Sequence, residues 1–134
     1  MPGRPVLYDD GVIIVFTVLL GLLTVFQIAL AAGAPLGAFA WGGQHQGSLP
    51  GRLRVASGMS VLICLLIAAI MLDRAEVLEW LPRGVSAIAA WVIFAYFILA
   101  TIMNLVSRSS KERAVMSPLA ALLAASALLI QLGY

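Results

Sequence analysis

Uncharged polar side chains recur at helical spacing inside the long apolar stretches of this sequence. Plotted at 100° per residue, they fall on one side of each stretch, and those nearest residues 33–54 are Gln27, Ser57, Ser60, Thr101, Asn104 and Ser117. Amide and hydroxyl groups of this kind could bind a ligand. They could equally hydrogen-bond one helix to the next and have no other role. Both interpretations stay open at this point.

A glycine-rich connection at residues 33–54 contains the only histidine, His45, together with Trp41, Arg52 and Arg54. Arg108 lies in a second polar connection. An imidazole could serve as an acid or base, and guanidinium groups bind phosphate. His45 is therefore the catalytic candidate if the protein is an enzyme. Otherwise it is a solvated side chain, and the arginines rest among lipid phosphates.

The sequence predicts no metal site and no cofactor. A structural or catalytic metal needs three or four ligands, and His45 has no cysteine, aspartate or second histidine near it in the sequence. Cys64, the one cysteine, has no base at its depth and is interpreted as a core residue. The net charge of +2 is too small and too scattered to indicate a nucleic-acid partner.

The composition indicates an integral membrane protein, with 63% hydrophobic and only 10% charged residues. Four apolar runs, at residues 12–32, 53–72, 85–106 and 114–132, are each close to the roughly 20 residues that cross a bilayer as a helix. We expect an all-α membrane protein, a single domain over residues 1–134 that forms a bundle of four transmembrane helices. The expected helices cover about 12–32, 50–72, 83–107 and 110–132, and residues 34–43 form an interfacial or re-entrant segment.

Local signals place the helix ends. Gly33 and Pro35 predict a break after the first helix. Ser48 is expected to cap the second helix. Ser109, with Glu112 three residues later, has the pattern of a capping box, so the fourth helix should begin just after Ser109.

Basic residues favour one threading. The connections at 33–54 and 107–113 share one side of the membrane and carry Arg52, Arg54, Arg108, Lys111 and Arg113. The other side carries Arg4, Arg74 and Arg83. Short basic connections stay in the cytoplasm. Both termini are therefore expected on the outer side of the plasma membrane. We expect this membrane to be a bacterial cytoplasmic membrane.

The small and polar faces of the helices should turn toward one another, because lipid offers hydrogen-bonding side chains no partner. Most of these groups also fall in the half of the membrane next to residues 33–54. We expect a polar vestibule there on the cytoplasmic side. Its expected ligand-binding residues are Gln27, Trp41, His45, Arg52, Arg54, Ser57, Ser60, Thr101, Asn104 and Arg108.

The segments GAPLGAFAWGG, LPGRLRVASG and MNLVSRSSKERAVMSP resemble those of small uncharacterised bacterial four-helix integral membrane proteins. The resemblance covers about a third of the chain, and it implies a fold without implying an activity.

The function expected first is that of a non-catalytic integral membrane protein whose vestibule binds a lipid headgroup, a small ligand or a partner subunit. The alternatives are a small membrane enzyme acting on a lipid, and an oligomeric pore or transporter for an uncharged solute. Membrane lipids are the expected partners. A homo-oligomer or a larger membrane complex is compatible with the same sequence.

Overall fold

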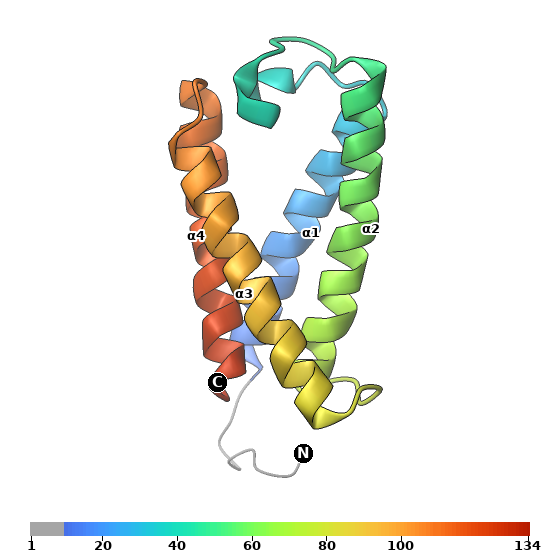
Figure 1. The fold of residues 1–134 in the computed structure, drawn as a ribbon, viewed down its shortest axis with the longest axis vertical. Coiled ribbons are helices and arrows are strands. Elements are labelled where there is room, and N and C mark those ends of the chain that lie inside the picture. The colour runs from blue at the N-terminus through green and yellow to red at the C-terminus, as the bar shows by residue number, and fades with distance from the viewer. Residues whose placement is uncertain (1–9) are drawn as a thin grey trace.

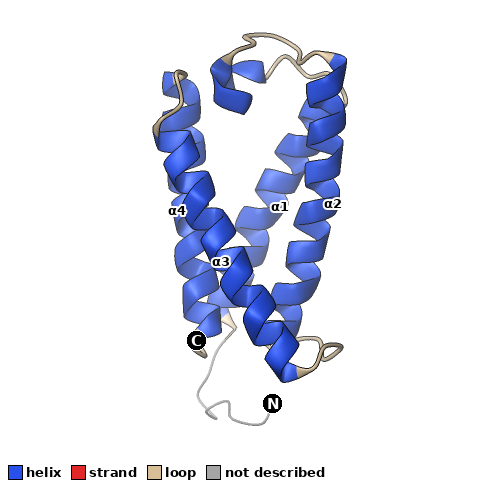
Figure 2. Cartoon of the chain, viewed as in Figure 1, coloured by secondary structure: helices blue, strands red, loops and turns tan. Residues whose placement is uncertain are grey.

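The computed structural model describes residues 10–134; Arg4, counted above for the threading, lies outside them. Its four long helices are α1 (Gly11–Ala31), α2 (Gly51–Arg74), α3 (Arg83–Leu105) and α4 (Ser110–Gln131) (Figure 1). The described part of the chain contains no strand (Figure 2). All four helices are long and apolar enough to cross a membrane. The predicted fold class, an all-α bundle of four membrane-spanning helices, is confirmed.

The helices associate as two pairs, α1 with α2 and α3 with α4. The pairs lie close together where α2 connects to α3, and they diverge toward the end where residues 33–50 cross over the bundle (Figure 1). We call residues 33–50 the lid, and that end of the bundle the lid end. The start of α1 and the end of α4 both lie at the opposite end (Figure 1).

The main apolar core lies in the half of the bundle away from the lid. Phe16, Met71, Phe97 and Leu123 are buried there, one from each helix, within a larger cluster of aliphatic side chains. The rings of Phe16 and Phe97 meet edge to face with their centroids 6.1 Å apart, a favourable aromatic geometry. Close packing at this end leaves the diverging lid end to be filled in another way.

A buried carboxylate organises the connection from α2 to α3. Asp73 lies one residue beyond the apolar run predicted to end at residue 72, but α2 continues through it and its side chain is fully buried. Its Oδ2 accepts hydrogen bonds from the backbone N–H groups of Trp80 (2.6 Å) and Leu81 (2.7 Å). Its Oδ1 forms an ion pair with Arg83. The end of α2 and the start of α3 are thus held together.

A second polar link ties α4 to the same end. The Nε of Arg74 donates to Oε1 of Gln131 at 2.6 Å, and Nε2 of Gln131 donates to the carbonyl oxygen of Ala87 at 3.0 Å. One amide side chain therefore joins α2, α3 and α4. Hydrogen bonds of this kind are favoured between membrane helices because an unpaired polar group in hydrocarbon is costly.

Replacing Asp73 by alanine should destabilise the bundle strongly. Two backbone N–H groups would lose their acceptor, at about 1–3 kcal/mol each. The measurement is thermal unfolding of the purified protein in detergent micelles, with Glu79→Ala as the control, since Glu79 is an exposed acid in the same connection. Equal melting temperatures for the two variants would contradict this role for Asp73.

Candidate functional site

The lid leaves α1 at a glycine and folds back over the bundle. Gly33 has a φ of +98°, a conformation that ends the helix and that side chains other than glycine rarely adopt. Two short 3₁₀ helices follow, η1 (Gly37–Phe39) and η2 (Trp41–Gly43). The lid thereby bridges from the α1–α2 pair toward the α3–α4 pair (Figure 1).

Hydrogen bonds fix the lid to α2 and to the residue before α4, and one closes the lid on itself. The indole Nε1 of Trp41 donates to Oγ of Ser57 in α2 at 3.1 Å, and the hydroxyl of Ser109 donates to the carbonyl oxygen of Ala38. The hydroxyl of Ser48 donates to the carbonyl oxygen of Gly33 at 2.6 Å, which closes the lid on itself. The prediction that Ser48 caps α2 is wrong: the residue before α2 is Pro50, and no side chain caps it.

Two glycines allow the lid to pack this closely. A Cβ on Gly37 would lie 2.1 Å from the carbonyl oxygen of His45, within the lid itself. A Cβ on Gly43 would lie 2.3 Å from the Cβ of Ser109, which immediately precedes α4. Neither position has room for any other residue without movement of the backbone.

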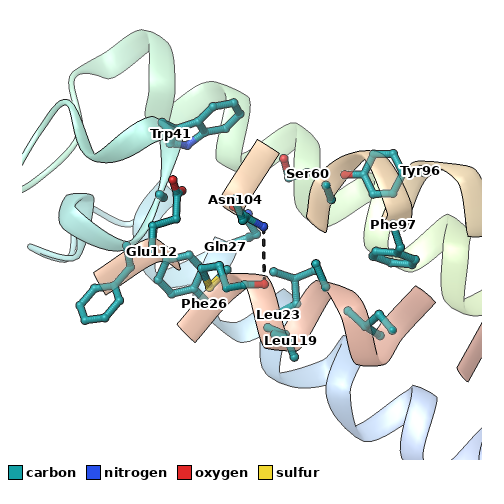
Figure 3. Close-up of a pocket in the computed structure, with 16 residues that line it drawn as sticks. Leu23, Phe26, Gln27, Trp41, Ser60, Tyr96, Phe97, Asn104, Glu112 and Leu119 are labelled. Atoms are coloured by element: carbon teal, nitrogen blue, oxygen red, sulfur yellow. Dashed lines mark hydrogen bonds between the residues drawn. The ribbon is translucent and has the colours of Figure 1, made fainter. Parts of the chain in front are cut away.

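An inner chamber of about 180 Å³ lies beneath the lid. Figure 3 shows Leu23, Phe26 and Leu119 on one side of the chamber, and the polar groups of Trp41, Ser60 and Glu112 on the other. It is lined by Leu23, Phe26, Gln27, Phe39, Ala40, Trp41, Ser60, Tyr96, Phe97, Ala100, Asn104, Glu112, Met116, Leu119, Ala120 and Leu123.

An outer groove of about 600 Å³ continues the chamber. Both share Trp41, Tyr96, Ala100, Asn104 and Glu112, and the groove adds Gly42, Gln44, Arg52, Leu53, Leu99 and Met103. Leu99 and Met103 are 59% and 61% exposed on a membrane-spanning helix, so they would face lipid. The cavity therefore opens sideways between α2 and α3. We call Leu99 and Met103 its rim, and the part next to Trp41, Asn104 and Glu112 its polar mouth.

Five of the ten residues predicted from the sequence line this cavity. Gln27, Trp41, Ser60 and Asn104 line the inner chamber, and Arg52 lines the outer groove. The amide Nδ2 of Asn104 donates to the carbonyl oxygen of Met116, at 3.5 Å (Figure 3). Three helices and the lid thus contribute these five side chains.

The other five lie elsewhere. Ser57 is the hydrogen-bond acceptor for the lid, Thr101 donates to the carbonyl oxygen of Phe97 at 2.7 Å, and Arg54 donates to that of Ala31 at 3.0 Å. His45 and Arg108 line neither part of the cavity. The Nε2 atom of His45 is buried and has no hydrogen-bond partner among residues 10–134.

The sequence interpretation missed Glu112 as a cavity residue. Half of the predicted capping box forms, because Oγ of Ser109 accepts from the backbone N–H of Glu112 at 3.3 Å. The reciprocal half does not form, since the N–H of Ser109 donates to Oγ of Ser107 at 3.1 Å. Glu112 stands four residues before Met116 on the inward face of α4, and this helical spacing is the signal that could have placed its carboxylate inside.

The cavity has mostly apolar walls and a few polar groups. No group of three or more His, Cys, Asp or Glu residues converges within residues 10–134. The Oε1 atom of Gln27 is buried without a hydrogen-bond partner in that range. A pocket with aromatic and aliphatic walls and a few polar groups at one end is typical of small-molecule and lipid sites.

Neither a protein-family model, nor a curated protein, nor a solved structure matches this chain.

The close approach of Gly43 to Ser109 yields a test of lid closure. Gly43→Ala should lift the lid, whereas Gly42→Ala should not, because both glycines have positive φ but only Gly43 meets a neighbour. The readout is the rate at which a water-soluble maleimide labels a Ser60→Cys variant on a Cys64→Ala background. We expect faster labelling with Gly43→Ala only, and equal rates for both glycine variants would exclude a seated lid.

Proposed function

We propose that this protein is a non-catalytic integral membrane protein that takes a membrane lipid into the cavity beneath the lid. The headgroup lies at the polar mouth, next to Trp41, Asn104 and Glu112, and the acyl chains leave between α2 and α3 toward the bilayer. The observation that carries this proposal is the sideways opening, whose rim of Leu99 and Met103 is continuous with the lipid-facing surface. A ligand from water would have no need of such a rim.

The lid end is proposed to face the cytoplasm, with both termini outside. Arg52, Arg54, Arg108, Lys111 and Arg113 are at the lid end, and a basic excess in short connections favours the cytoplasmic side. The membrane is proposed to be a bacterial cytoplasmic membrane.

The threading can be tested with reporters fused to the C-terminus. An alkaline phosphatase fusion should be enzymatically active, and a fluorescent-protein fusion should not fluoresce, because both reporters would lie outside the cytoplasm. The reverse pattern would invert the proposed threading.

The enzyme and pore alternatives have less support in the geometry. His45 would be the acid or base of a lipid-modifying enzyme, yet it does not line the cavity. The pore alternative requires an oligomer, because a path through one copy would have to pass the buried core around Phe16, Met71, Phe97 and Leu123. The chamber ends on that core, as expected of a binding site.

Filling the shared part of the cavity should abolish lipid retention. Ala100 lines both the chamber and the groove, so Ala100→Trp would place an indole where the two meet. The matched control is Ala95→Trp, an exposed position on the same helix that lines neither part. The measurement is native mass spectrometry of bound phospholipid after mild delipidation.

Wild type and Ala95→Trp should each retain one phospholipid, and Ala100→Trp should bind it about tenfold or more weakly, which corresponds to about 1.4 kcal/mol. Equal retention by Ala100→Trp and Ala95→Trp would show that the lipid binds the outer surface and would refute the proposal.

A further inference from the structure

Glu112 places a carboxylate in the wall of the cavity. Its side chain lines both the chamber and the groove, and the residue is only 5% exposed. Within residues 10–134 no hydrogen bond or ion pair reaches its carboxylate oxygens. A carboxylate that faces a largely apolar cavity attracts a positive charge or hydrogen-bond donors. Its place in the first turn of α4 adds only a modest favourable field.

Three of the cations near the lid end interact with groups other than Glu112. The guanidinium of Arg113 donates to the carbonyl oxygen of Ser107 at 2.6 Å, and Arg54 donates to that of Ala31. The ammonium of Lys111 lies over the ring of Phe39, 5.7 Å from its centroid. Arg52 lines the outer groove, but it forms no ion pair with the carboxylate of Glu112. Among residues 10–134, no cation is therefore paired with the carboxylate of Glu112.

The side chains around Glu112 present acceptors and aromatic faces. Oε1 of Gln27 is unpartnered, and Asn104 uses its amide N–H to reach Met116, which leaves its oxygen available. Trp41 and Tyr96 line the chamber and groove together with Glu112, and Figure 3 shows the Glu112 carboxylate pointing toward Trp41. A carboxylate beside aromatic rings is the environment that attracts an ammonium group.

On the basis of the proposed function, we infer that the cavity selects amphiphiles whose headgroup carries a protonated amine or an ammonium, which binds the Glu112 carboxylate. Gln27 and Asn104 accept its further hydrogen bonds. Arg52, in the outer groove, is placed to meet a phosphate when the amphiphile carries one. The amine could come from an aminophospholipid or from a free amphiphilic amine, and the chemistry at Glu112 is common to both.

The first test compares ligands on the unmodified protein. Native mass spectrometry measures retention of phosphatidylethanolamine, of its N-acetyl derivative, of phosphatidylglycerol and of dodecylamine. We expect the amine-bearing forms to be retained about tenfold more strongly than the N-acetyl form, because charge-assisted hydrogen bonds exceed neutral ones. Equal retention of phosphatidylethanolamine and its N-acetyl form would overturn the inference, whether or not any variant folds.

The second test removes the charge. Glu112→Gln keeps the shape of the side chain and should abolish the preference for amines while phospholipid is still retained. The control is Glu79→Gln, an exposed acid at the opposite end, which should keep the preference. A preference that survives Glu112→Gln would assign amine recognition to another group and would refute the role of Glu112.

The outcomes separate the two proposals. Loss of all lipid retention in wild type would overturn the proposed function itself. Retention of lipids without regard to the amine would overturn only the recognition by Glu112. Retention of dodecylamine but not of phosphatidylethanolamine would support an ammonium site whose ligand is a free amphiphile, and retention of both would point to the aminophospholipid.

Discussion

The pairing of Asp73 with the start of α3 is the interaction on which the shape of the bundle depends. Its carboxylate binds two backbone N–H groups and Arg83, so the last turn of α2 and the first turn of α3 cannot separate. The link from Arg74 through Gln131 adds α4 at the same end. The two helix pairs are thus held together at this end, and they diverge at the lid end, where the long connection joins α1 to α2 within one pair. The cavity is a consequence of that divergence.

The lid completes the cavity because the diverging helices cannot close over it themselves. Its seat depends on short contacts that only glycine permits, at Gly37 and Gly43, and on hydroxyl groups of neighbouring elements. The chamber combines apolar side chains with a few polar groups from the lid, α1, α2, α3 and α4. Such a mixed wall is what the proposed amphiphile would need.

Much of the fold follows from the sequence, because hydrophobic runs and helix-ending residues act locally. The runs predicted four spans, and Gly33 and Ser109 marked helix ends that the structure reproduces to within a few residues. Polar residues on the inward faces of the spans gave Gln27, Ser60 and Asn104 as neighbours of one cavity. These inferences needed only periodicity and depth.

The rest depends on contacts between distant segments. Whether the carboxylate of Glu112 turns back to its own helix or inward depends on Ser107 competing for the N–H of Ser109. From the sequence, Asp73 would be taken for an exposed acid in a connection. It is buried because the fold places it against Arg83, ten residues later. The sequence predicts His45 as a vestibule residue because it lies in the glycine-rich connection, but it lines neither part of the cavity, since position in a connection does not fix which way a side chain turns.

Ser109 shows how lid and binding site are joined. One hydroxyl group accepts from the first turn of α4, where Glu112 begins to turn inward, and donates to the lid at Ala38. Displacing the lid would leave that proton without its acceptor, and unwinding the first turn would free the oxygen. An occupant that contacted both Glu112 and the lid would therefore favour the closed lid, and by reciprocity a closed lid would favour that occupant.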